Sequence, residues 1–123
     1  MTEAHLAVDR SQPNEVRIAV GGEIDLANAT TVEQQLLDAI SNQNTEVTLD
    51  LSDLSYIDSA GLQVLFTLST RLQMLQIALE LVVPTESPIR KIIELSGVTT
   101  AIPVRPVRTE VRSLPGRWTQ PDQ

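Results

Sequence analysis

The order of apolar and polar residues along the chain predicts strands that alternate with helices. Two short strands are expected first, at residues 4–9 and 15–20, because four turn-forming residues in a row lie between them, Ser11-Gln12-Pro13-Asn14. These strands should pair as an antiparallel hairpin, and Gly21-Gly22 should end the second one.

A helix is predicted next, with Asn28 as its N-cap, because an asparagine side chain can accept hydrogen bonds from the free N–H groups of a first turn. Ala29, Val32, Leu36 and Ile40 recur at spacings of three and four residues, which places them on one helix face. This helix should bury that face against the sheet.

The middle of the chain predicts a strand followed directly by a second helix. Val47, Leu49 and Leu51 alternate with polar residues, which is typical of a strand with one buried face, and the strand pattern stops at Ile57. A helix is expected over residues 59–72. The residues predicted to share its inner side are Leu62, Leu65, Phe66, Ser69 and Leu72.

The last part of the chain predicts one more buried strand, a helix and a weak edge strand. Residues 77–83 have little polarity, Ser87-Pro88 is a typical helix start, and Gly97 is a typical helix stop. Prolines within residues 102–107 restrict a strand there to the edge of the sheet. A final helical turn is expected at residues 109–114.

These elements together predict a single α/β domain at residues 1–114. Its mixed sheet should have four to five strands with helices packed on one face, and residues 115–123 should form a flexible tail. No internal repeat interrupts this pattern.

Composition narrows the possible functions. The 123 residues carry a net charge of -7, which argues against nucleic acid as a direct partner, and they include no cysteine, which excludes disulfides. The sequence contains neither a leader peptide nor an apolar run long enough to span a membrane, so we expect a cytoplasmic protein. We also expect it to need no cofactor.

The most informative residues lie where the second predicted helix begins, in the polar step Asp58-Ser59-Ala60-Gly61. A serine at a helix N-terminus exposes its hydroxyl, and the N–H groups there favour an anion beside it. Asp58 can cap the helix, and Gly61 leaves room for close approach of another group. Asp25 also follows the end of an apolar strand, so Asp25 and Asp58 should lie on the same rim of the sheet.

Enzymatic activity is not expected. The glycine-rich nucleotide motifs and the nucleophile motif Gly-x-Ser-x-Gly are absent, and His5 is the only histidine, so a histidine-rich metal site is excluded. A small hydrolase that uses Ser59 remains an alternative only if the fold brings the His5 imidazole next to Ser59.

Two motifs resemble those of the STAS domain, and more narrowly those of bacterial anti-anti-sigma factors, which are also called anti-sigma factor antagonists. They are GEIDLANA at residues 22–29 and LDLSDLSYIDSAGLQVL at residues 49–65. The segment at residues 84–104 fits the same family, and the resemblance covers about residues 4 to 112. It implies the same mixed sheet with helices on one face.

The resemblance also implies a mechanism. In such proteins the serine of the Asp-Ser-x-Gly step is phosphorylated by an anti-sigma factor that is also a serine kinase, and a PP2C-type phosphatase reverses this. The unphosphorylated form binds the anti-sigma factor, which releases the sigma factor. By position, Ser59 is the phosphoacceptor, Asp58 orients it, Asp25 shapes the docking rim, and Gly61 and Leu62 belong to the contact surface.

The sequence departs from the family pattern in two places. Met74-Leu75-Gln76 stands where the family usually has a glycine between the second helix and the next strand, and residues 103–121 are rich in arginine and proline. The switch motif itself is intact. An alternative is a constitutive STAS subunit of a lipid-transport or signalling assembly, in which Ser59 only caps a helix.

Overall fold

A hairpin opens the fold, as the turn residues predict. The computed structural model describes residues 2–107, in which β1 (Ala4–Asp9) and β2 (Glu15–Ile24) pair antiparallel. Asn14, in the turn between them, adopts φ 66°, a conformation that asparagine tolerates better than most residues.

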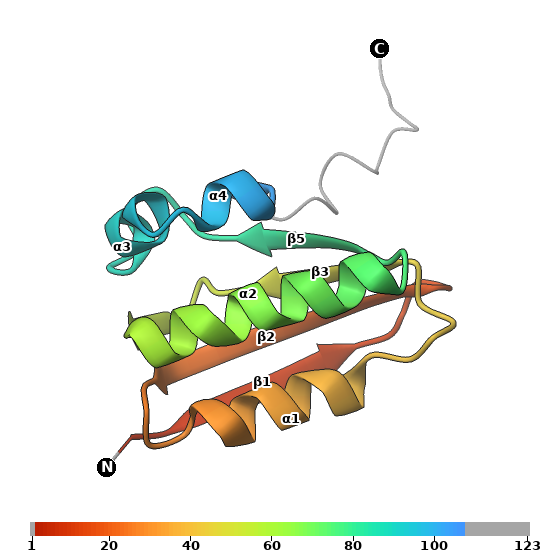
Figure 1. The fold of residues 1–123 in the computed structure, drawn as a ribbon, viewed down its shortest axis with the longest axis horizontal. Helices are drawn as coiled ribbons and strands as arrows, with labels where there is room; N and C mark the ends of the chain where they lie inside the picture. Colours follow the sequence, from red (N-terminus) through yellow and green to blue (C-terminus); the bar gives the residue numbers. More distant parts are fainter. Residues whose placement is uncertain (1, 108–123) are drawn as a thin grey trace.

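All the remaining strand pairs of the sheet are parallel. The described residues form a six-stranded sheet in the order β1-β2-β3-β5-β6, with β4 beside the far end of β2 (Figure 1). The further strands are β3 (Glu46–Asp50), β4 (Leu54–Ile57), β5 (Ala78–Val82) and β6 (Val104–Arg105). This arrangement confirms the α/β class with a mixed sheet.

Four helices connect the strands in the described part of the chain. They are α1 (Ala29–Ala39), α2 (Ser59–Met74), α3 (Arg90–Leu95) and α4 (Val98–Ala101). Figure 1 shows α1 and α2 lying side by side in front of the sheet, with α3 and α4 along the β5 side. None of the helices in residues 2–107 combines the length and the apolar character needed to cross a bilayer.

The core lies between the sheet and the helices, because alternate residues of each strand point to the helix side. Val16, Ile18 and Val20 of β2 are fully buried, and they continue into Val47 and Leu49 of β3. The opposite face of the sheet carries polar side chains and has no helix over it among the described residues. This one-sided packing is the layer arrangement that the sequence predicts.

Two predictions about the strands were wrong. Gly21-Gly22 does not end β2, which continues to Ile24, because the glycines serve an irregularity within the strand. Gly22 has φ 92°, and a Cβ there would lie 2.4 Å from the Glu3 carbonyl oxygen. The segment from Leu49 to Ile57 is also two strands, so the sheet has six strands rather than four or five.

The predicted inner face of α2 was shifted by part of a turn. Leu65 and Leu72 are buried as expected, but Leu62, Phe66 and Ser69 are only half-buried. Their places in the core are taken by the residues Gly61, Val64 and Leu68. The shift arises because α2 packs against both the sheet and α1, and the sequence pattern does not show which neighbour each side meets.

The third helix also differs from the prediction. Ile89 and Ile93 are buried, whereas Ile92 is 38% exposed and Leu95 is 77% exposed, and a separate short helix α4 follows Gly97. The short strand β6 pairs with β5 as an edge strand, as the prolines predict. The final turn predicted at 109–114 and the tail predicted at 115–123 lie outside the described residues.

Candidate functional site

The candidate site lies where two parallel strands end side by side. Ile24 closes β2 and Ile57 closes β4, and the two residues are paired across the sheet. The Asp58 N–H donates to the Ile24 carbonyl oxygen at 3.2 Å, which holds the following chain segments together. The structure thus brings Asp25 and Asp58 to one rim, as predicted.

Asp58 caps α2. Its Oδ1 accepts hydrogen bonds from the backbone N–H groups of Ala60 at 2.9 Å and Gly61 at 3.1 Å, and its Oδ2 accepts from the Leu26 N–H at 3.2 Å. One carboxylate therefore satisfies two orphan donors of the helix and also ties down the loop after β2. The predicted capping role of Asp58 is confirmed.

Ser59 is the first residue of α2, and it is exposed. No hydrogen bond within residues 2–107 involves its hydroxyl. The N–H groups of Ala60 and Gly61 already donate to Asp58, so Ser59 itself is not required as the cap. Its hydroxyl is chemically free at the positive end of a 16-residue helix.

Asp25 is held by a different set of contacts. Its Oδ2 accepts from the Thr2 hydroxyl at 2.6 Å, and its Oδ1 accepts from the Ala27 N–H at 2.8 Å. The hydrogen bond from Thr2 is the main reason that the pKa of Asp25 lies below its usual value of 3.8. The backbone N–H groups of Ala27 and Asn28 act in the same direction, and burial opposes them with a smaller effect than that of Thr2. Asp25 is therefore a persistent negative charge on the rim.

Asn28 stands at the N-cap of α1, as predicted, but its side chain makes no capping bond with that helix. Its Oδ1 accepts from the Asp25 N–H at 2.9 Å, and its Nδ2 donates to the Glu23 carbonyl oxygen at 2.9 Å. The capping part of the prediction was wrong because the side chain stabilises the turn that precedes the helix.

Gly61 is buried and faces the core, so it offers no surface to a partner. A Cβ at this position would lie 2.5 Å from Ile57 Cγ1 and 3.1 Å from Ile24 Cγ2. Gly61 thus allows the first turn of α2 to sit directly on the two strand ends, and it acts on the rim only indirectly. Leu62, the next residue, is half-buried and remains available at the surface.

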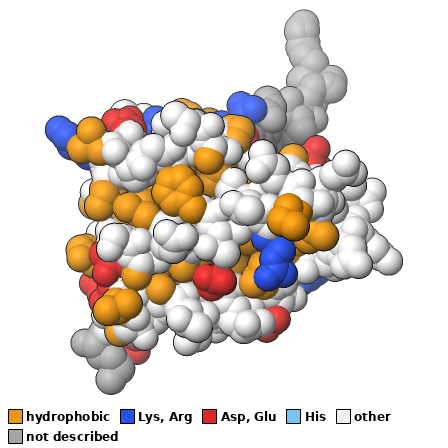
Figure 2. Space-filling view, viewed as in Figure 1, with side chains coloured by type: hydrophobic (Ala, Val, Ile, Leu, Met, Phe, Trp, Pro, Cys, Tyr) orange, Lys and Arg blue, Asp and Glu red, His pale blue; other side chains and the backbone are white. Residues whose placement is uncertain are grey.

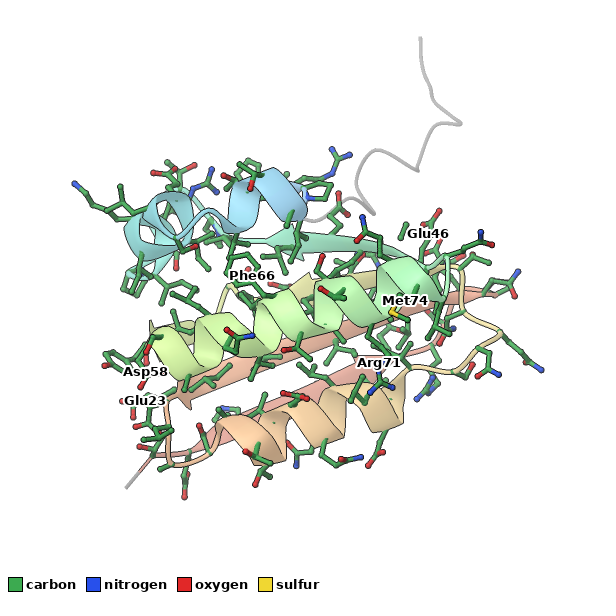
Figure 3. All side chains as sticks on the ribbon, in the orientation of Figure 1. Glu23, Glu46, Asp58, Phe66, Arg71 and Met74 are labelled. Carbon is green, nitrogen blue, oxygen red and sulfur yellow. The ribbon has the colours of Figure 1, made fainter. Side chains whose placement is uncertain are left out.

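The structure adds exposed apolar residues that the sequence reasoning missed. Leu26 is 82% exposed although its N–H is held by Asp58, and Tyr56 of β4 is 50% exposed beside Glu23 of β2. Glu23 and Asp58 lie at the same end of the molecule in Figure 3. In the sequence, Leu26 is a single large apolar residue within a polar turn, and this pattern could have indicated an exposed contact residue.

A hydrophobic area lies beside this rim, between α2 and the helices α3 and α4. Figure 2 shows apolar side chains gathered on the left of this face and towards its centre, and Phe66 lies on the side of α2 that faces α3 and α4 (Figure 3). The rim therefore combines acidic groups, two exposed apolar anchors and a neighbouring apolar strip. Such a combination suits a protein partner better than a small substrate.

The structure does not bring His5 to Ser59. The His5 imidazole lies over Gly21 of β2, near Asp53, and within the described residues no hydrogen bond joins it to Ser59. Nor do residues 2–107 place three carboxylate or imidazole groups where they could hold a metal ion. The arrangement therefore offers a modifiable hydroxyl and a contact surface.

Comparison with known proteins agrees with the geometry. The STAS domain family matches residues 7–112. BtrV of Bordetella bronchiseptica, which is named as an anti-sigma factor antagonist, is 36% identical over 84 residues, or 68% of this chain and 71% of BtrV.

Solved structures share the fold. An anti-sigma factor antagonist from Mycobacterium paratuberculosis has a TM-score of 0.77 at 21% identity, covering 94% of this chain and 96% of that chain. The anti-sigma factor antagonist SpoIIAA in its unphosphorylated form has a TM-score of 0.70 at 19% identity, covering 94% of this chain and 100% of SpoIIAA.

Proposed function

The chain belongs to the STAS domain family, and from this premise we propose that it is an anti-sigma factor antagonist controlled at Ser59. The unphosphorylated domain binds an anti-sigma factor through the rim and so frees a sigma factor. That anti-sigma factor is also the serine kinase that phosphorylates Ser59, and a PP2C-type phosphatase restores the binding form. The proposal rests chiefly on one observation: the Ser59 hydroxyl is exposed at the start of α2 and makes no hydrogen bond within residues 2–107.

The contact surface follows from the side chains around that hydroxyl. Leu26 and Tyr56 are exposed apolar anchors, Leu62 adds a half-buried one, and Asp25 and Asp58 supply the negative charges. The Leu26 loop is held by Asp58, so little conformational entropy is lost when it docks. Gly61 supports the surface from beneath.

Phosphorylation then acts through charge rather than through unfolding. A phosphate adds about -1.5 to -2 charges at pH 7, and a helix N-terminus tolerates an anion. Because Asp58 already accepts from Ala60 and Gly61, the phosphate takes up little of the helix's donor capacity and stays exposed to the partner.

The magnitude is sufficient for a switch. One contact between like charges at about 4 Å costs about 4 kcal/mol at an effective dielectric constant of about 20. A loss of only about 2.7 kcal/mol weakens binding about a hundredfold. Two forms of a relative fit this view, because SpoIIAA of Bacillus has been solved both unphosphorylated and phosphorylated.

The test uses the anti-sigma kinases of the source organism. Each is incubated with the chain and ATP, mass spectrometry locates any phosphate, and titration calorimetry measures binding. We expect phosphate on Ser59 alone, unchanged binding for Ser59→Ala, and binding about a hundredfold weaker for Ser59→Asp.

The matched control is Ser41→Asp, which adds the same charge at an exposed serine just after the C-terminal end of α1. It should leave binding of the anti-sigma factor unchanged. Equally tight binding by Ser59→Asp and the native chain would falsify the switch. In that case a constitutive subunit of a larger assembly becomes the better explanation.

A further inference from the structure

The outer edge of the sheet at β1 is open. In the described part of the chain β1 pairs only with β2, and most of its residues are exposed, including Val8 at 44%. The strand contains no lysine, proline or bulge, which are three of the devices that prevent an edge strand from pairing with another chain.

The backbone groups that face outward can be assigned. The Glu23 N–H donates to the Glu3 carbonyl oxygen at 2.8 Å, so Glu3 forms a hydrogen-bonded pair with β2. Because such pairs alternate along an antiparallel ladder, the N–H and C=O groups of Ala4, Leu6 and Val8 point away from β2. These groups form the free edge.

Charge selects how a second β1 strand fits this edge. An antiparallel pair centred on Leu6 sets Glu3 opposite Asp9, which is a repulsive contact, and one centred on His5 sets histidine against histidine. A pair centred on Ala7 sets His5 opposite Asp9 at both ends and Leu6 opposite Val8. Ala7 then meets Ala7 at a non-hydrogen-bonded position, where small side chains suit the close approach.

We propose that two copies of this chain associate through their β1 edges, antiparallel and centred on Ala7, so that the two sheets become one continuous sheet. A strand of six residues buries little surface, so the dimer is weak and forms at high local concentration. The rim with Asp25 lies near the start of β1, since Thr2 donates to Asp25, and the two rims therefore lie at opposite ends of the pair. Each copy keeps its own Ser59 accessible. This inference does not depend on the function of Ser59.

The absence of cysteine makes cysteine cross-linking a clean test. Across the proposed axis the two Ala7 Cα atoms are about 4.5 Å apart, within the roughly 4.4–6.8 Å that a disulfide spans. The Cα atoms of the two His5 residues are about 14 Å apart and those of the two Leu6 residues about 9 Å apart, beyond that range. Under mild oxidation we expect Ala7→Cys to dimerise at least about tenfold faster than His5→Cys or Leu6→Cys.

A second measurement is independent of cysteine. Sedimentation equilibrium up to about 1 mM should show a reversible dimer for the native chain. Val8→Pro removes one outward N–H without touching the β1–β2 ladder, so it should keep the circular dichroism spectrum and lose the dimer.

Three outcomes overturn the proposal. They are a chain that stays monomeric at about 1 mM, fastest cross-linking through Leu6→Cys, and β1 amides that gain protection from hydrogen exchange only with a different protein.

Discussion

The two ends of α2 differ in where glycine is found and where glycine would fit best. At the N-terminal end Gly61 is required by space, because a Cβ would lie 2.5 Å from Ile57 Cγ1. At the C-terminal end Gln76 adopts φ 61°, a left-handed conformation in which glycine costs least, yet the chain has no glycine there. The N-terminal end therefore has the residue that its space requires, and the C-terminal end has a glutamine in a strained conformation.

The C-terminal end shows how the strain is tolerated. The Gln76 N–H donates to the Gln73 carbonyl oxygen at 3.1 Å, and the Ile77 N–H donates to the Leu72 carbonyl oxygen at 2.8 Å, which together make a Schellman motif. Leu72 and Ile77 are both buried, so the motif is anchored in the core. The helix ends there because of these contacts, despite the absence of the usual glycine.

The comparison shows where this fold is constrained. The N-terminal end has to hold Asp58, Ser59 and the Leu26 loop in one geometry, so steric fit is strict. At the C-terminal end, where Met74 is 77% exposed, the contacts described within residues 2–107 are those that terminate the helix.

The largest expected effect comes from filling the space at the N-terminal end. Gly61→Ala should lower the free energy of unfolding by about 1–3 kcal/mol through overpacking, despite the roughly 1 kcal/mol that alanine gains in helix propensity. Chemical denaturation measures it. In an Ile57→Ala background the same substitution should cost less, and an equal cost in both backgrounds would show that Ile57 is not the obstacle.

Removal of the cap should have the next largest effect. Asp58→Ala loses three hydrogen bonds from backbone N–H groups and should lower the free energy of unfolding by about 1–2 kcal/mol. Asp58→Asn keeps an acceptor oxygen, so it should cost clearly less in the same thermal or urea melts. If both variants lost equal stability, the negative charge rather than the hydrogen bonds would matter.

At the other end a substitution should stabilise the protein. Gln76→Gly removes the cost of about 1–2 kcal/mol that a side chain has in the left-handed conformation. Glycine's extra conformational freedom in the unfolded chain offsets about 0.5–1 kcal/mol of this gain. The free energy of unfolding should rise by roughly 0.5–1 kcal/mol, and Gln76→Asn should give part of that gain. A loss of stability in Gln76→Gly would contradict the strain at this position.

The smallest effect concerns acid pH and the rim. The pKa of Asp25 is lowered in the folded protein, so its carboxylate stabilises the fold at pH values above its usual pKa. That contribution is lost as the pH falls through the lowered value. Between about pH 6 and about pH 3 the melting temperature of Asp25→Asn should therefore fall less than that of the native chain. Thr2→Val, which removes the hydrogen bond to Asp25, should also reduce this fall in melting temperature, but by less than Asp25→Asn.

Much of the architecture was predictable from local pattern. The Ser11-Asn14 turn and the flanking alternation determined the hairpin, the spacing of apolar residues placed α1 and α2, and the prolines restricted β6 to an edge. The polar step at Asp58 also indicated the cap and the position of Ser59. These features depend on neighbours close in sequence, and the residue types alone determine them.

Other features depended on which elements meet in space. The orientation of the Asn28 side chain, the crowding at Gly61 and the side of α2 that is buried all depend on chain segments distant in sequence. The strand ends predicted that Asp25 and Asp58 share a rim, but no local pattern specified that the Leu26 N–H would donate to Asp58 across it. Burial and hydrogen bonding between distant segments are properties of the packed molecule, so only the tertiary structure decided them.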